Sequence, residues 1–359
     1  MYSDIPSSPV DDDISSALVA SVLPVKEIAL HRNNVLKDMI SEFKDATVLM
    51  CSLEFVFIND RGDIEVGRGS GVMREALSIF WREFFSALSS GASEKVPSIR
   101  HDYQKEEWQS VARILVVGFE KQRYFPLNLS QAFIASCLFG EEALPKKMLS
   151  ESFYEYISRD ERETLTQSIS NECDPSTDDE VLEILSSYNC KSRVTKENMP
   201  KIIEELAHQE IIQHPKYIAS AWAPIICSLK AFVEFKCIPS LKSLYELKRP
   251  TPKTVIKLFD AKTATDNERE CFAHLKRFVK SLDISMLGVF LQFITGSNVI
   301  TVDKIEVEFT EEDGATRRPY AHTCVPLLKL PSTYTSYNEL SEEFSCVLRE
   351  TSAWAFNII

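Results

Sequence analysis

The sequence predicts an α+β fold in two parts, the first larger and mostly helical, the second smaller and mixing helices with a sheet. Three observations support this prediction. The chain has 359 residues, 44% of them hydrophobic, which is enough for two cores. Apolar residues recur at helical spacing through the first two-thirds, whereas Ile305–Phe309 alternates as a half-exposed strand does. Between these regions, Lys248-Arg249-Pro250-Thr251-Pro252 contains two X-Pro bonds, which disfavour helix.

The first part begins with an acidic tail and a turn rich in glycine. Residues 1–23 hold four Asp and no Lys or Arg, so we expect a disordered tail rather than a signal peptide. Residues 24–45 carry a helical pattern, and residues 46–58 indicate an extended segment. Three of the ten glycines lie in Gly67–Gly71, which predicts a tight turn with positive φ or close backbone approach. The helix after it has an apolar stripe of Leu77, Phe80, Trp81, Phe84, Phe85 and Leu88.

More helices are predicted before the Pro-containing run. They cover residues 104–119, 130–139, 150–158, 178–188, 197–212 and 217–235. Thr177 and Glu180 match a capping box at the start of one of them. We place the end of the first part at residue 249, a connector at 250–252, and the second part at 253–359.

The second part is predicted to place a cysteine near the end of a strand. Thr265 caps a helix with the stripe Phe272, Leu275, Phe278, Val279 and Leu282. After the strand at Ile305–Phe309, Asp313-Gly314 predicts a β-hairpin. The returning strand would run through Arg317 and Arg318 and end close to Cys324. Ser336 then caps a last helix that turns Leu340, Phe344, Val347 and Leu348 inward.

Composition excludes several classes of protein. A net charge of −13 and a pI near 5.1 argue against a nucleic-acid or anionic membrane surface. Nine cysteines contain no C-x-x-C and no His pair at ligand spacing, so we expect no metal and no cofactor. The odd count, without an export signal, predicts reduced thiols and an intracellular location in the cytoplasm or nucleus. The apolar runs are too short to span a membrane.

The run Arg318-Pro319-Tyr320-Ala321-His322-Thr323-Cys324 is the most informative motif, and three others support it. Phe290–Ser297 (FLQFITGS) precedes it, Tyr334–Leu340 (YTSYNEL) follows it, and Phe356 lies fourth from the end of the sequence. Gly67–Glu75 (GRGSGVMRE) adds a glycine-rich turn with an Arg-Glu pair. Together these runs resemble HECT-type E3 ubiquitin ligase domains from about residue 46 to 359. The residues of these motifs are most similar to those of the subset around the G2/M-phase-specific E3 ubiquitin-protein ligase.

The resemblance implies a two-lobe architecture and a chemistry. A helical N-lobe would cover residues 46–249, and a mixed α/β C-lobe residues 253–359. The implied partners are ubiquitin, a ubiquitin-conjugating enzyme and a protein substrate that the sequence does not identify. Cys324 would accept ubiquitin as a thioester and pass it to a substrate lysine. His322, Thr323 and Phe356 would support it, with the Phe356 ring helping to position the C-lobe.

The residues around Cys324 also have plainer interpretations. Arg317 and Arg318 either favour the thiolate or form a solvated pair, with equal weight. A structural role for His322 is favoured over a general base. Thr323 either orients the loop or fits it, and Phe356 would by default be an ordinary residue of a terminus. The attacking lysine requires a carboxylate to take its proton, and the sequence does not rank the four near Cys324: Asp303, Glu311, Glu312 and Asp313.

One region departs from the family pattern. Lys146–Arg193, where the resemblance places the grip on the conjugating enzyme, is shorter than usual and contains the acidic run Asp174–Glu180. This leaves open a second function, a catalytically weak or inactive HECT-like binding module of the ubiquitin pathway. A third, a cysteine hydrolase, has no local signature around any cysteine.

Overall fold

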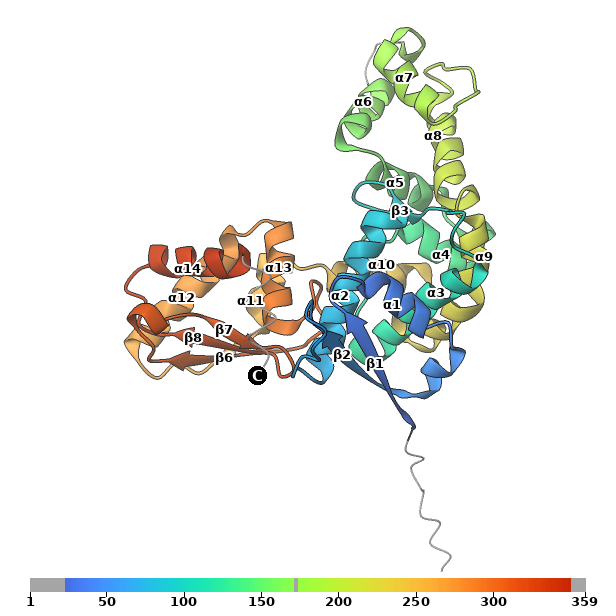
Figure 1. Ribbon diagram of the computed structural model, residues 1–359. Helices are drawn as coiled ribbons and strands as arrows, with labels where there is room; N and C mark the ends of the chain where they lie inside the picture. The colour runs from blue at the N-terminus through green and yellow to red at the C-terminus, as the bar shows by residue number, and fades with distance from the viewer. Residues whose placement is uncertain (1–22, 171–173, 350–359) are drawn as a thin grey trace, which may run out of the picture.

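The chain is an α+β protein with two hydrophobic cores. The computed structural model describes residues 23–170 and 174–349. The first core collects buried side chains from Ile28 to Tyr245, and the second from Val255 to Leu348. Figure 1 shows the second core, in orange and red, beside the blue end of the first. One later residue, Val299, packs into the first core.

The chain begins its described part with a strand, where the sequence predicted a helix over 24–45. β1 (Val25–His31) pairs in parallel with β2 (Ser52–Ile58), and α1 (Val35–Glu42) crosses between them. Burial alternates along β1, since Ile28 and Leu30 are buried while their neighbours are exposed. This period of two overrides the helical spacing. A 3₁₀ turn, Ala46–Met50, occupies the start of the segment that was predicted to be extended.

A helical bundle forms the centre of the first core. The stripe predicted on α2 (Ser70–Ala87) is confirmed, with Phe85 alone only partly buried. The rings of Trp222, from α9 (Lys216–Ile226), and Phe84 lie 6.4 Å apart between centroids. α3 (Lys105–Gln122) and α4 (Gln131–Phe139) complete the bundle, with the short strands β3 (Ser89–Ser90) and β4 (Val96–Pro97) at its side.

A group of helices projects from this bundle. It contains α5 (Lys146–Tyr156), α6 (Arg159–Ser170), α7 (Asp179–Ser187), α8 (Met199–His208) and a π-helical turn, Gln209–Gln213. In Figure 1, α6 and α7 lie farthest from β1 and β2. The cap of α7 is Asp178 and not the predicted Thr177, because the Asp178 carboxylate accepts from the backbone N–H of Glu180 and Val181. The helix predicted over 217–235 ends at Ile226 and continues as 3₁₀ turns.

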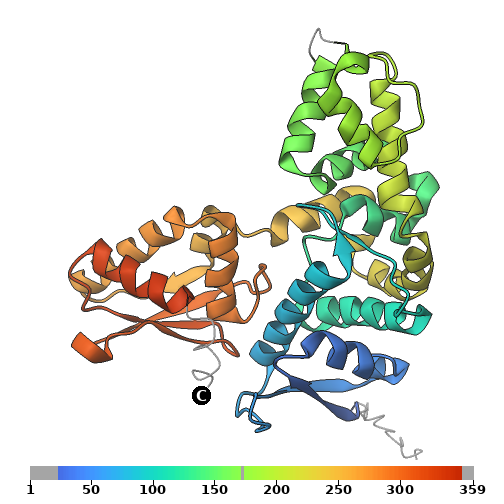
Figure 2. The ribbon, with the colours of Figure 1, turned by 45° about the horizontal axis from the view of Figure 1, so that its top comes forward.

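The chain passes to the second core between two helices. α10 (Ile238–Lys248) ends at Lys248, and α11 (Pro252–Leu258) begins at Pro252. The Thr251 hydroxyl accepts from the Thr254 N–H and caps α11. Only Arg249–Thr251 therefore lies outside a helix here. Figure 2 shows this passage above the contact between the two cores.

The second core packs α11 and three longer helices against a four-stranded sheet (Figure 1). The longer helices are α12 (Asp266–Ser281), α13 (Ile284–Thr295) and α14 (Tyr337–Arg349). The strand order is β5 (Phe259–Ala261), β6 (Ile305–Thr310), β8 (Leu327–Pro331) and β7 (Tyr320–His322). The predicted caps of α12 by Thr265 and of α14 by Ser336 are confirmed.

The hairpin predicted at Asp313-Gly314 is wrong. β6 pairs in parallel with β8, and the antiparallel pair is β7–β8, one strand later. Gly314–Thr316 forms a 3₁₀ turn in which the Asp313 carboxylate accepts from the Gly314 N–H. The Arg317 guanidinium donates to Glu343 on α14, and the chain does not reverse beside β6. It enters the sheet again as β7, on the far side of β8. The returning strand starts at Tyr320, after both arginines.

Candidate active site around Cys324

Cys324 lies in the turn of the β7–β8 hairpin. The register pairs His322 with Leu327, which leaves Thr323–Pro326 as the turn. The Cys324 side chain is half-buried, and its neighbour Val325 is 63% exposed. The cysteine is thus held at the end of a rigid sheet and close to solvent, a common place for a reactive group.

The Cys324 loop contacts the glycine-rich turn of the first core. The Cys324 Sγ donates a hydrogen bond to the Arg68 carbonyl oxygen at 2.7 Å, and the Ser70 hydroxyl donates to the Cys324 carbonyl at 3.1 Å. The prediction for this turn is confirmed in both respects. Gly69 has φ of +94°, and a Cβ on Gly71 would lie 2.7 Å from the Cys324 nitrogen. Residues more than 250 positions apart therefore build one site.

Arg74 joins three segments beneath the cysteine. Its guanidinium donates to the Thr323 carbonyl, to the Thr295 carbonyl at 2.6 Å, and to Gln122 Oε1 at 3.1 Å. The residue is only 6% exposed. Burial lowers the pKa of Arg74 from its usual value, and negative charge on Cys324 counteracts that effect.

Sequence reasoning missed this role of Arg74. It used Arg74 only as part of a motif and sought cations near Cys324 along the chain. One signal was present, because Arg74 lies on the apolar side of α2, three residues before Leu77. A charged residue in such a position is nearly always buried with partners.

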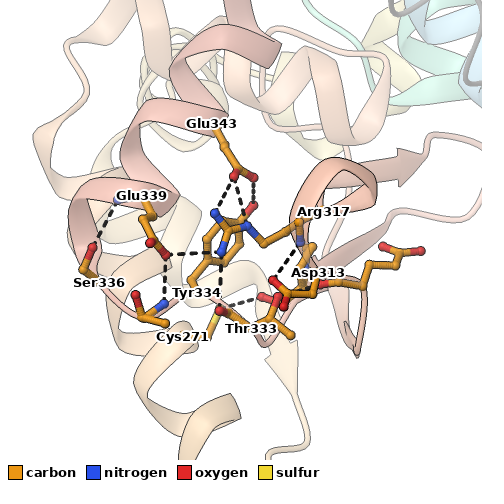
Figure 3. Close-up of polar contacts among 12 residues, drawn as sticks. Cys271, Asp313, Arg317, Thr333, Tyr334, Ser336, Glu339 and Glu343 are labelled. Carbon is orange, nitrogen blue, oxygen red and sulfur yellow. Dashed lines mark hydrogen bonds and ion pairs between the residues drawn. The ribbon is translucent and has the colours of Figure 1, made fainter.

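Arg317 is a structural residue and takes neither of its two predicted roles. Figure 3 shows its guanidinium between the carboxylates of Glu343 and Glu339, at 2.8 and 3.2 Å, with the Tyr334 hydroxyl on the other oxygen of Glu343. The guanidinium carbon lies 4.7 Å from the Tyr334 ring centroid. Arg317 therefore ties the loop before β7 to α14, while Arg318 is exposed.

Removing the Arg317 side chain will destabilise the second core. Arg317→Met leaves the partly buried Glu343 carboxylate without its cation, which costs about 1–3 kcal/mol of unfolding free energy. Arg318→Met is the matched control, and an exposed site of this kind changes stability by less than about 0.5 kcal/mol. Urea denaturation followed by tyrosine and tryptophan fluorescence measures both. Equal midpoints for the two variants would contradict the structural role of Arg317.

The other predicted site residues are placed as follows. His322 is the last residue of β7, and its ring meets the Tyr320 ring edge-on at 5.8 Å. β7 ends at His322, so His322 and Cys324 are not alternate residues on one face of a strand. Thr323 Oγ1 is buried without a hydrogen-bond partner among the described residues, and the Thr323 carbonyl accepts from the Arg74 guanidinium. Phe356 lies outside the described residues. Of the four carboxylates, Glu312 accepts from the Thr310 hydroxyl and Asp313 from the Gly314 N–H.

The fold and the site define an α+β protein that presents a cysteine on a hairpin turn between two cores. The family described as HECT-domain (ubiquitin-transferase) matches residues 132–357, more than half of the sequence. The chain therefore belongs to the HECT-domain family of ubiquitin transferases. A comparison with curated proteins found no match. Across residues 23–170 and 174–349, no helix is long and apolar enough to cross a membrane.

Proposed function

We propose that the chain is an E3 ubiquitin-protein transferase that carries ubiquitin on Cys324. The observation that supports this most is the place of the Ala-His-Thr-Cys motif. It lies within the family match and puts the cysteine on a hairpin turn beside an exposed Val325. The other described cysteines lack this setting, since Cys51, Cys137 and Cys271 are buried and none of the rest lies in a hairpin turn.

The proposed reaction consists of two acyl transfers. The Cys324 thiolate attacks the thioester carbon at the C-terminus of ubiquitin, and the sulfur of the conjugating enzyme leaves as a thiolate that takes up a proton. A substrate lysine amine then attacks the same carbon, an amide forms as the amine loses a proton, and the Cys324 sulfur leaves as a thiolate that takes up a proton. Cysteine suits both steps, because thiol exchange changes little in free energy and a thiolate is a good leaving group toward an amine.

The two cores correspond in this proposal to the two lobes of the family. The first core would be the N-lobe, the second the C-lobe, and Arg249–Thr251 the connector. Within the family we place the chain near the G2/M-phase-specific subset, because the residues of the motif around Cys324 are similar to that subset. A cytoplasmic or nuclear location is part of the proposal, because the mechanism needs a reduced thiol.

The proposed partner in the first step is a ubiquitin-conjugating enzyme bound by the projecting helices. A groove beside α5 and α8 contains the apolar side chains of Leu144 and Leu149 between Lys146, Lys201 and Glu204. The acidic run Asp174–Glu180 lies elsewhere, at the start of α7. There the Asp178 carboxylate accepts hydrogen bonds from backbone N–H groups of the helix. The groove therefore gives the reduced region a partly apolar surface of its own.

The second candidate is a binding module that has lost transfer. One observation favours it: the Cys324 thiol points at the Arg68 carbonyl, 2.7 Å away, instead of standing free in solvent. One experiment separates the two functions. The chain is incubated with activating enzyme, a panel of conjugating enzymes, ATP and labelled ubiquitin. A reductant-sensitive adduct supports the transferase, and its absence with every conjugating enzyme supports the module.

Phe356 gives a test of the second transfer alone. Phe356→Ala should leave loading of Cys324 intact and slow lysine modification by about tenfold or more, since misplacing one reacting group costs rates of this order. Trp354→Ala, in the same terminal run, is the matched control. Single-turnover discharge of preloaded chain onto free lysine and onto protein measures the step. Equal discharge rates for Phe356→Ala and wild type would remove Phe356 from the mechanism.

A further inference from the structure

The Cys324 loop rests on a surface that we call the cysteine seat, defined as Arg68, Ser70, Gly71 and Arg74. Each of the four contributes one contact. The Arg68 carbonyl accepts from the thiol, the Ser70 hydroxyl donates to the Cys324 carbonyl, and Arg74 donates to the Thr323 carbonyl. The absent side chain of Gly71 admits the loop, since a Cβ would lie 2.7 Å from the Thr323 carbonyl carbon.

The seat is held in place from its own side. Arg32, directly after β1, pairs with Glu65 before the turn and with Glu75 on α2, the latter at 2.7 Å. The Arg32 guanidinium also lies over the Phe57 ring, 4.2 Å from its centroid. These contacts fix both ends of the glycine-rich turn to the β1–β2 pair, so the seat does not depend on the loop that it receives.

One contact of the seat requires the free thiol. When Cys324 becomes a thioester, the sulfur forms a bond to the ubiquitin carbonyl carbon, and its proton ends on the thiol of the conjugating enzyme. An acylated sulfur has no hydrogen to donate, so it would face the Arg68 carbonyl oxygen without a hydrogen bond. Gly69 is a close neighbour of the sulfur, since a Cβ there would lie 3.5 Å from Sγ, in ordinary van der Waals contact.

We propose that the seat binds the Cys324 loop while the thiol is free and releases it when the thiol is acylated. This inference rests on the proposed function and deepens it, because it assigns Gly71, Ser70 and Arg74 as positioning residues. Loading would thereby free the second core to move from the conjugating enzyme toward the substrate lysine. By thermodynamic linkage, contacts that stabilise the seated loop oppose acylation to the same extent.

The first test is the reactivity of Cys324 toward iodoacetamide, which needs no ubiquitin enzymes. Peptide mass spectrometry follows Cys324 and uses the exposed Cys227 and Cys237 as internal references. Gly71→Ala places a methyl group against the loop backbone, and overpacking of this kind should speed Cys324 alkylation roughly tenfold or more. Because Gly71 is helical with negative φ, alanine suits the α2 backbone, so folding is retained.

Two further variants separate the contacts of the seat. Ser70→Ala removes one hydrogen bond to the loop and should speed alkylation about two- to tenfold. Arg82→Met, at an exposed position of the same helix, is the matched control and should react as wild type does. Unchanged Cys324 rates in both Gly71→Ala and Ser70→Ala would overturn the proposal.

The second test asks whether modifying the sulfur releases the loop. Hydrogen exchange is measured on peptides covering residues 66–74 and 320–327, before and after Cys324 is carboxamidomethylated. The proposal expects faster exchange in both peptides after modification, and equal protection would overturn it. The outcomes are independent of transferase activity. An adduct with ubiquitin but no seat effect refutes the seat alone, whereas a seat effect without any adduct refutes the proposed function.

Discussion

Replacing Cys324 by alanine is expected to abolish the ubiquitin adduct completely. The proposed mechanism has one nucleophile, and the first acyl transfer cannot occur without its sulfur. The assay uses activating enzyme, conjugating enzyme and labelled ubiquitin, with the adduct resolved on gels with and without reductant. Cys324→Ser should instead give a weak adduct that resists reductant, because an oxygen ester forms slowly and is not cleaved by thiols.

The matched control for this experiment is Cys346→Ala. Cys346 is an exposed thiol of the same core, on α14, and its removal should leave the adduct at the wild-type level. A reductant-sensitive adduct that survives Cys324→Ala but is lost in Cys346→Ala or another single cysteine variant would show that the wrong cysteine was assigned. The Cys324→Ala chain should retain its fold, because the side chain is only half-buried and fills no core.

The elements that the sequence predicted best are long helices with wide apolar stripes. α2 and α14 have the predicted buried faces because many residues at one spacing agree. β1 was missed because it has only seven residues, and over so short a run its alternation of apolar residues also fits the start of a helical pattern. The hairpin at Asp313-Gly314 was wrong because local turn chemistry does not reveal which strands pair, and the parallel partner of β6 lies across a long connection.

The part of the site that lies in one short run of sequence was predictable, whereas its contacts with residues far away in the sequence were not. A motif identified Cys324, since its signal is contained in seven consecutive residues, whereas its place near a strand end was inferred from a strand expected to run through Arg317 and Arg318. The seat depends on α2 and the hairpin meeting in space, and no periodicity encodes that meeting. Arg317 illustrates the same limit, because proximity in sequence suggested an effect on Cys324, whereas the guanidinium turns to Glu343 and Glu339 on α14.

The contact between the two cores makes the connector the second place where a large effect is expected. The Ile300 N–H donates to the Lys248 carbonyl at 3.0 Å, the Tyr124 hydroxyl donates to Asn298 at 2.9 Å, and Val299 packs in the first core. These contacts hold one relative placement of the cores. Since the thiol must meet a conjugating enzyme first and a lysine later, we expect the cores to move apart about Arg249–Thr251.

Deleting Arg249–Thr251 should therefore reduce loading of Cys324 below detection. A chain spans at most about 3.3–3.6 Å per residue, so the deletion removes roughly 10 Å of reach. The length-matched control replaces Arg249 and Pro250 by glycine and keeps Thr251, whose hydroxyl caps α11; it should load within about threefold of wild type, because reach is preserved and only stiffness changes. Circular dichroism and urea denaturation check that both chains are folded. If the folded deletion variant loads ubiquitin at the wild-type rate, the two cores need not move about this connector, because the thiol then reaches the conjugating enzyme without it.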